Sequence, residues 1–399
     1  MMNKNEWKKV KLGDVFELQI GRTPSRNNKN YWDNGSNNWI SISDIKENEK
    51  YIEKTKEKIT NLAIQDSKIK LVPKNTVIMS FKLSVGKAAI TSQDIYTNEA
   101  IVAFIPKVLN LVDNNFLYYY LQNINWKDGI NKAVKGLTLN KPLISNKIIF
   151  LPDLKIQKQI AKKLDTVFSI LNLKKQQFFE FEKLIKFQFL KMFGDPVTNS
   201  KNQKLILLEN CISKKSDLVD GPFGSSINTK VDYTDTGDIP VIRTKNVDFM
   251  TFNPKDLKFI TKEKYEQIKR SQILPGDIIL TKVGTIGNVC IFPNIFSEGV
   301  LSTTGSCRIR VAAHKINNIF LGYYLLYYKE KLLKIASTGV QPFLNMTHIK
   351  NIQVFNIEIE LQNKFADFVR QIEKCLFELQ KSIDETQLLF DSLMDKYFS

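Results

Sequence analysis

Two long stretches carry the hydrophobic periodicity of a long amphipathic helix, and the second runs from Leu361 to Tyr397. The first runs from Leu154 to Phe193 with neither proline nor glycine, and its apolar residues recur at steps of three and four except where Lys174 takes one position. The second lies at the C-terminal end, where Thr386 replaces one apolar residue. At about 1.5 Å per residue, such a helix would span roughly 60 Å. A stripe this long needs a partner, so we predict that the two helices pack on each other as an antiparallel coiled coil.

The residues that we expect in this packed seam are apolar and follow one face of each helix. They are Ile160, Leu164, Val167, Leu171, Phe178, Phe181, Ile185, Phe365, Phe368, Ile372, Leu376, Leu379, Ile383 and Phe390.

The segments that precede the two helices repeat the same order of features. Gly86 matches Gly287, Phe116 matches Phe320, and Gln157 matches Gln362, at offsets of 201 to 205 residues. A nearly constant offset over several landmarks indicates a tandem duplication. The fold class that we predict is mixed α/β, with two tandem globular domains separated and joined by the two helices in a pseudo-twofold repeat.

Short apolar runs between turn residues predict the strands of each domain. We expect strands over residues 39–44, 85–90 and 148–152, a turn followed by a buried strand over 72–80, and a short helix over 116–121. The matching segments of the second half are 238–244, 274–280 and 285–289. The helix stop Gly194-Asp195-Pro196 marks the joint between the halves. The predicted boundaries are 1–152 for the first domain, 153–195 for the first helix, 196–357 for the second domain and 358–399 for the second helix.

The chain is strongly basic, with 58 lysine and arginine residues against 41 acidic ones and a net charge of +17. An excess of this size favours a polyanionic partner, most often nucleic acid. A genome of skewed base composition would also enrich lysine, asparagine and isoleucine together, so the charge alone does not decide.

No catalytic or cofactor motif stands out in the sequence. Gly86-Lys87 lacks the glycine and the hydroxyl residue of a phosphate-binding loop, and no Gly-x-Gly-x-x-Gly opens a helix. Asp153 follows Pro152 at a helix start, where aspartate is an ordinary N-cap. Four scattered cysteines and two histidines argue against a zinc cluster and suit the reducing cytoplasm. We therefore expect a non-catalytic cytoplasmic chain without a bound cofactor or metal, without a signal peptide and without a membrane span.

Several short motifs, taken in order and repeated twice, resemble the specificity (S) subunit of type I restriction–modification systems, the HsdS family. In the first half they are Trp7 to Asp14, Gly21-Arg22-Thr23-Pro24-Ser25, Tyr31-Trp32 and Trp39-Ile40. In the second half they are Asp220 to Ser225, Pro240 to Arg243, Gly284 to Gly287 and Gln341 to Asn345. The second half departs from the first in lacking a proline at the position of Pro152, which leaves the start of its helix open by a few residues.

The resemblance implies two target recognition domains, each reading one half of a split sequence in double-stranded DNA. It implies that the helices set the spacing and that their outer faces dock two methyltransferase subunits, which would bind adenosylmethionine and methylate adenine. Restriction and translocation subunits are further partners that it allows.

Arg, Asn, Gln, Ser and Thr on loops are the residue types that read bases, and Lys and Arg contact phosphates. In the first domain our candidates for DNA contact are Arg22, Thr23, Ser25, Arg26, Lys29, Lys82, Ser84, Lys87, Lys135 and Thr138. In the second domain they are Ser225, Ser226, Lys230, Arg243, Lys245, Lys282, Thr285, Arg308 and Gln341. The alternative for each is a solvated loop residue. For the tyrosines at 118–120 and 323–324, packing of a short helix competes with base stacking and is favoured.

Two functions from other classes stay open at this point. The chain could be a stand-alone enzyme that modifies or cleaves DNA, or a coiled-coil adaptor without a role on DNA. The half-site sequences, the spacer length and the presence of a functional nuclease subunit do not follow from the sequence.

Overall fold

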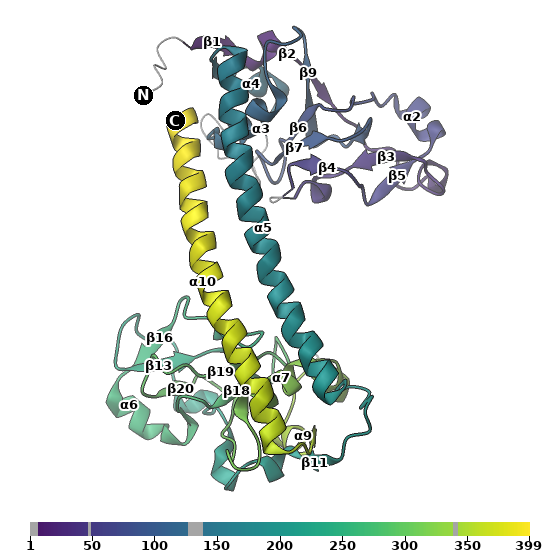
Figure 1. Cartoon of the computed structure of the whole chain (residues 1–399). Helices are drawn as coiled ribbons and strands as arrows, with labels where there is room; N and C mark the ends of the chain where they lie inside the picture. The colour runs from purple at the N-terminus through teal and green to yellow at the C-terminus, as the bar shows by residue number, and fades with distance from the viewer. Residues whose placement is uncertain (1–6, 47–48, 127–138, 338–341) are drawn as a thin grey trace. The chain divides into compact units, whose positions relative to one another are not determined.

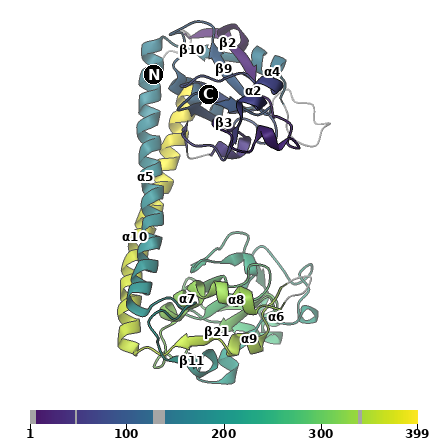
Figure 2. The same cartoon turned by 90° about the vertical axis from the view of Figure 1, so that its right-hand side faces the viewer.

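The computed structural model of the chain describes residues 7–46, 49–126, 139–337 and 342–399. It divides into two compact units, one of residues 1–177 with 380–399 and one of residues 178–379. The cuts fall inside the two long helices, α5 (Leu154–Phe193) and α10 (Ile359–Phe398). Each unit therefore contains one mixed α/β domain and one part of each long helix, and the two helices run side by side within it (Figures 1 and 2).

The first unit holds a five-stranded sheet in the order β2-β9-β6-β7-β4 and a three-stranded sheet in the order β5-β3-β8. The strands of the larger sheet are β2 (Phe16–Ile20), β4 (Tyr51–Ile52), β6 (Val77–Ser80), β7 (Ala88–Thr91) and β9 (Ile101–Pro106). Those of the smaller sheet are β3 (Asn37–Ile40), β5 (Glu57–Ile59) and β8 (Tyr96–Thr97). Strands β6 and β7 and the first four residues of β9 are buried, which agrees with their continuous apolar sequence.

The second unit repeats most of this strand order, with one sheet in the order β12-β21-β18-β19 and another in the order β16-β13-β20-β17, which has one strand more than its counterpart. The strands of the first sheet are β12 (Leu218–Asp220), β18 (Ile278–Thr281), β19 (Val289–Ile291) and β21 (Ser306–Ile309). Those of the second are β13 (Ile239–Ile242), β16 (Lys258–Ile260), β17 (Gln272–Ile273) and β20 (Gly299–Leu301). The antiparallel and parallel pairings around β3 recur around β13, so the duplication extends to strand order.

A two-stranded antiparallel ribbon closes each domain. Strand β1 (Lys8–Lys11) pairs with β10 (Ile148–Leu151), and β11 (Leu205–Leu207) pairs with β22 (Gln353–Phe355). The ribbon brings the first and last strands of a domain together immediately before a long helix begins.

The remaining elements are short helices, turns and a hairpin. The helices are α1 (Leu12–Val15), α2 (Asn61–Ser67), α3 (Asn114–Asn123), α4 (Lys141–Asn146), α6 (Lys262–Gln267), α7 (Asn318–Tyr327), α8 (Lys329–Ile335) and α9 (Met346–Lys350), and the hairpin is β14 (Val247–Asp248) with β15 (Thr251–Phe252).

A buried glutamine fastens each long helix to its own domain. The Gln157 side chain accepts a hydrogen bond from the backbone of Asp113, the N-cap of α3, at 2.9 Å and donates to the carbonyls of Leu111 and Pro152. In the second unit, Gln362 accepts from the backbone of Asn317, the N-cap of α7, at 2.8 Å. Both glutamines are 1% exposed. Since a buried amide must be satisfied, the contact fixes where each helix leaves its domain.

Lys174 and Thr386, the polar residues that interrupt the apolar seams of α5 and α10, contact each other. In the first unit the Lys174 ammonium donates to the Thr386 hydroxyl at 2.8 Å and to the Ser382 hydroxyl at 2.6 Å. In the second unit the seam is aromatic, and Phe189 and Phe193 both pack edge-on against Phe365. These contacts confirm the antiparallel pairing, because the later part of one helix meets the earlier part of the other.

The predicted seam residues are all buried or half-buried. Ala161, Ala366 and Val369 are also buried, although their spacing did not single them out.

Predicted strand boundaries were wrong in both units. In the second, the strand expected over 238–244 ends at Ile242 and the one expected over 285–289 begins only at Val289. The first unit shows the physical reasons. The strand expected over residues 39–44 ends at Ile40, because the Asp44 side chain accepts from the backbone of Ser41 and turns the chain into a 3-10 helix. The strand expected over 85–90 begins at Ala88, because Gly86 has a φ of +91° and forms a turn with Ser80.

Replacing Gln362 by leucine should destabilise the second unit. The change leaves the partly buried N–H of Asn317 without its acceptor, at an expected cost of about 1–3 kcal/mol in the free energy of unfolding. The thermal midpoint of unfolding, followed by circular dichroism, measures the effect. The exposed residue Gln371 on the same helix provides the matched control, since Gln371→Leu should change stability by less than about 0.5 kcal/mol. Equal midpoints for the two variants would contradict the fastening role.

Candidate nucleic-acid interface

The predicted contact loops of the first unit leave the same end of one sheet. Strands β2 and β6 both pair antiparallel with β9, and their last residues, Ile20 and Ser80, lie opposite the first residues of β9. The loops 21–26 and 81–87 therefore start on either side of the beginning of β9. This arrangement brings together candidates that lie about sixty residues apart in the sequence.

The second unit presents its loops in the same way. Asp220 at the end of β12 lies opposite Cys307, and Thr281 at the end of β18 lies opposite Ser306. The loops 221–226 and 282–287 thus flank the beginning of β21. Both domains gather their candidate residues at the matching end of the matching sheet.

A glycine at the start of the first loop lets the backbone approach closely. A side chain at Gly21 would meet the Thr97 carbonyl at 2.0 Å, and one at Gly221 would meet the Thr303 carbonyl at 1.9 Å. Neither position tolerates a Cβ atom. These glycines therefore fix the backbone at the start of each loop.

Two tryptophans hold the first loop in the first unit. The Trp32 indole donates to the carbonyl of Ser25, and the Trp39 indole donates to the carbonyl of Arg22, both at 3.1 Å. The Arg26 guanidinium lies 3.9 Å from the centre of the Trp32 ring and pairs with Glu57. The loop backbone is thereby held in place while polar side chains on it face solvent.

The other first-unit candidates fall into three groups. Arg22, Ser25, Lys29 and Ser84 are exposed, although Arg22 donates to the Ser67 carbonyl at 3.0 Å. Lys82 and Lys87 are half-buried, and the Thr23 hydroxyl donates to Glu99. Lys135 and Thr138 lie outside the described residues.

In the second unit, Ser226, Lys230, Lys245 and Thr285 are exposed, and Lys245 pairs with Asp256 at 3.2 Å. The half-buried Arg243 donates to the Asp256 carbonyl. Ser225 lies beside Ser226 in the 3-10 helix Gly224–Ser226. Gln341 lies outside the described residues.

Lys282 and Arg308 are placed differently from what the sequence suggested. Each is only 4% exposed. Lys282 lies 3.5 Å from the Asp220 carboxylate, and Arg308 donates to the carbonyls of Ser216 and Gln272. Burial lowers the pKa of the Arg308 guanidinium, with Arg310 adding to the effect. These contacts give both side chains a structural role, because a group already surrounded by protein presents little surface to a ligand.

The sequence reasoning missed a second basic surface in the second unit. A cavity of about 540 Å³ in the first unit is lined mainly by charged residues of both signs, whereas a cavity of about 530 Å³ in the second is mainly basic. Besides the buried Arg308, which was already a candidate, the basic lining comprises Lys214, Lys215, Lys269, Arg270, Arg310 and Lys350. The adjacent pairs Lys214-Lys215 and Lys269-Arg270 were the signal available in the sequence.

The tyrosines of α3 and α7 pack in the domain cores. Tyr118, Tyr119, Tyr120, Tyr323 and Tyr324 are all buried, which agrees with packing of the two short helices. Within the described ranges, no cluster of three histidine, cysteine or acidic side chains could hold a metal ion. Nor does any helix of those ranges have the length and apolar character to cross a membrane.

Comparison with known proteins gives concordant results. A family model for the type I restriction modification DNA specificity domain matches residues 4–180 and 213–386. The chain is 24% identical over 411 residues to the type I restriction enzyme MjaIX specificity subunit of Methanocaldococcus jannaschii, covering 98% of this chain and 92% of that protein. It is 31% identical over 117 residues to the EcoprrI specificity subunit of Escherichia coli, covering 29% of this chain and 28% of that protein.

Solved structures share the fold. The S subunit of a type I restriction–modification system from M. genitalium superposes with a TM-score of 0.60 at 15% identity, covering 100% of this chain and 98% of that one. A chain from a structural study of complex assembly in the type I R-M system gives a TM-score of 0.58 at 15% identity, covering 98% and 97%.

Replacing Arg308 by alanine should destabilise the second unit, because two carbonyls lose a charged donor worth about 1.5–3 kcal/mol. Arg270→Ala is the matched control, since Arg270 lines the same cavity but its side chain is 62% exposed. Its removal should change stability by less than about 1 kcal/mol. Thermal unfolding of both variants measures the difference. If Arg308→Ala unfolds at the wild-type temperature, Arg308 is available for another role.

Proposed function

The chain belongs to the type I restriction modification DNA specificity family and is a specificity subunit of such a system, and from this premise we propose that each of its domains reads one half of a split DNA sequence. The observation that carries the proposal is the repeated match, since each of residues 4–180 and 213–386 spans most of one domain and the greater part of its long helix. Two copies of one reading unit on a single chain suit a target in two parts.

The loops at the sheet ends are the proposed base-reading elements. They share a glycine start and then diverge, from Gly21-Arg22-Thr23-Pro24-Ser25 in one domain to Gly221-Pro222-Phe223-Gly224-Ser225 in the other. A constant frame with different loop side chains fits two readers of different sequences. Exposed lysines near these loops, Lys29 and Lys230, are proposed to contact phosphates.

The outer faces of the long helices fit a docking role. In the first unit, α5 exposes Ile170 and Leu173, and α10 exposes Leu388 and Leu389. In the second unit the exposed large apolar residues of the two helices are Phe179, Leu184, Phe187, Leu361 and Phe377. Large apolar side chains gathered on a surface favour a protein partner.

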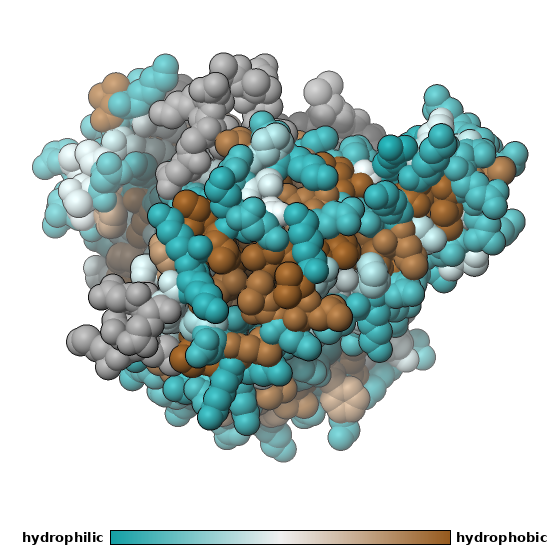
Figure 3. All heavy atoms as spheres, turned by 90° about the horizontal axis from the view of Figure 1, so that it is seen from above, coloured by the Kyte–Doolittle hydropathy of each residue, from teal (hydrophilic) through white to brown (hydrophobic). Residues whose placement is uncertain are grey.

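Apolar residues are exposed elsewhere in the first unit as well. Strand β10 buries Ile149 and Leu151 and exposes Ile148 and Phe150. Figure 3 shows apolar side chains gathered among polar ones on one face of the chain.

We propose that two methyltransferase subunits dock on the helices and supply the chemistry, with adenosylmethionine bound to them. This chain would then be non-catalytic and act in the cytoplasm, where its DNA is found. Restriction and translocation subunits would join the same assembly. The net charge of +17 supports a polyanionic substrate for the whole.

Exchanging residues 1–152 for the corresponding domain of a relative should change one half of the methylated motif and leave the other half unchanged. Each domain carries its own reading loops, so the two halves are expected to be separable. Sequencing the methylated sites of cells that carry either the parental or the exchanged chain gives the recognition motif of each chain. A change in both halves of the motif, or in neither, would contradict the proposal that each domain reads one half.

Replacing Leu173 and Leu388 by aspartate should prevent assembly with the methyltransferase subunits without unfolding the chain, since these side chains are 65% and 69% exposed. The mass of the co-purified complex, measured by light scattering, gives the result. Leu109→Asp is the control, because Leu109 is 83% exposed in a loop of the same unit. Wild-type assembly of the double variant would place the docking surface elsewhere.

A further inference from the structure

A lysine side chain of the first unit lies in a box of aromatic rings. Lys50 is 6% exposed, and its ammonium lies 4.8 Å from the centre of the Tyr119 ring, 5.4 Å from Tyr118 and 5.6 Å from Tyr51. It pairs with the Asp165 carboxylate of α5, which also accepts from the Tyr119 hydroxyl at 2.6 Å. One cation thereby links the edge of the domain to its long helix.

The duplication identifies the equivalent place in the second unit. Tyr119 of α3 matches Tyr323 of α7, each at the fourth position from the matched Phe116 and Phe320. In parallel strand pairing, Tyr51 lies opposite Ile90 and Met250 lies opposite Cys290. Cys290 is one residue before Ile291, the match of Ile90. By this register Met250 stands where Lys50 stands in the first unit. Its thioether packs toward Gly322, so the second unit has no cation at this position.

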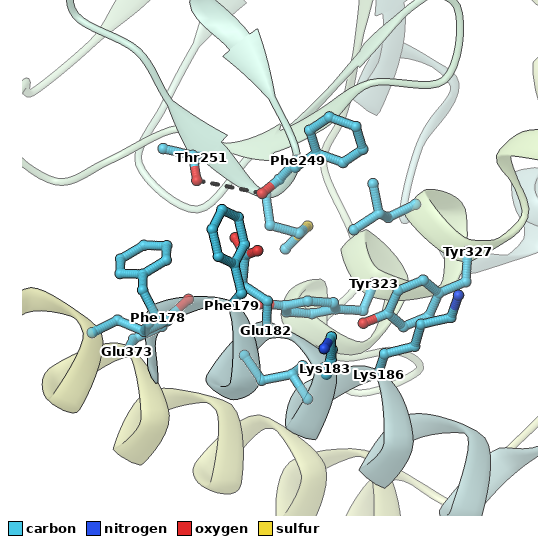
Figure 4. A pocket seen from close by; sticks show the side chains of 14 residues that line it. Phe178, Phe179, Glu182, Lys183, Lys186, Phe249, Thr251, Tyr323, Tyr327 and Glu373 are labelled. Carbon is cyan, nitrogen blue, oxygen red and sulfur yellow. Dashed lines mark hydrogen bonds between the residues drawn. The ribbon is translucent and has the colours of Figure 1, made fainter. Parts of the chain in front are cut away.

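A cavity of about 600 Å³ is found there instead (Figure 4). Its aromatic lining consists of Phe178, Phe179, Phe249, Tyr323 and Tyr327. Figure 4 shows the Tyr323 and Tyr327 rings on one side of the pocket and Phe249 on the other, with Phe179 and Glu182 entering from α5. The volume is in the range typical of small-molecule sites.

Two carboxylates from different helices also line this cavity, Glu182 of α5 and Glu373 of α10. Burial raises the pKa of both carboxyl groups. Lys183 and Lys186 also line the cavity, but among the described residues no ion pair joins either of them to these two carboxylates. Lys183 pairs with Glu180 at 2.8 Å, and the Lys186 ammonium lies 5.8 Å from the centre of the Tyr327 ring. Two partly desolvated negative charges beside aromatic faces are complementary to an organic cation with more than one charge.

We propose that this pocket binds a linear aliphatic polyammonium ion, a free polyamine, whose charged ends meet Glu182 and Glu373 and whose methylene groups lie against the rings. The bound ion would do in the second unit what Lys50 does in the first. It would link the domain edge at Met250 to the long helices. The first unit carries its cation within the chain, and the second unit takes one from solution.

Isothermal titration of the purified full-length chain with spermidine tests the proposal, at constant ionic strength. We expect saturable binding with one equivalent per chain. Hexane-1,6-diol, which has a similar chain without charge, and Mg²⁺, which has charge without a chain, should not bind with this stoichiometry.

Variants of the pocket make the test specific. Glu182→Gln with Glu373→Gln should weaken spermidine binding at least tenfold. Glu360→Gln with Glu378→Gln is the matched control, with the same charge change at two exposed residues of α10 that do not line the cavity, and should bind as the wild type does. Circular dichroism confirms that both double variants are folded.

The comparison with Lys50 of the first unit supplies a second test. Met250→Lys places an ammonium at the position of Lys50 and should abolish spermidine binding, while Met250→Leu should retain it. Absence of saturable binding to the wild type, or equal loss in the pocket and control variants, would overturn the proposal. Unchanged binding by Met250→Lys would do so too, because the ion would then lie elsewhere.

Discussion

The fold depends on one buried amide at the start of each long helix. Gln157 and Gln362 each bind the N-cap backbone of a short core helix and a carbonyl of the segment that leads into the long helix. An amide in an apolar core must satisfy both its donor and its acceptor, so few directions of the long helix are compatible with it. The two domains therefore carry their helices in the same way, although most of their other side chains differ.

A second constraint acts between the helices. A continuous apolar seam tolerates sliding by one heptad, because each step presents similar side chains to the partner. The Lys174 ammonium is satisfied by Ser382 and Thr386 at one register, and a slide would bury it against apolar residues. Lys174 and Thr386, the polar residues that interrupt the two apolar seams, thus select the register in which the helices pair. For a subunit whose helices are proposed to set the spacing of two readers, a unique register has a direct functional value.

The same frame supports two different sets of loop residues. Gly21 and Gly221 meet a backbone carbonyl so closely that only glycine fits, whereas Arg22, Ser25 and Phe223 in the loops that follow are exposed. Buried basic residues show the limit of this freedom. Arg308 and Lys282 carry the residue type expected at a DNA surface, but they bind carbonyls and a carboxylate within the protein. Residue type alone does not distinguish a phosphate contact from a structural cation.

The sequence by itself determined the long helices, their pairing and the duplication, because period and offset are properties of the chain that packing does not change. It also favoured core packing for the tyrosines of α3 and α7, since they lie in short, strongly apolar segments. Only the tertiary structure decided which basic side chains are exposed and that Lys174 meets Thr386. It also decided that β7 begins after Gly86 and that β3 ends before the turn at Asp44. It alone showed that the place of Lys50 is a cavity in the second unit. Burial, register and the meeting of distant loops depend on contacts between residues far apart in the chain, and no local pattern encodes those contacts.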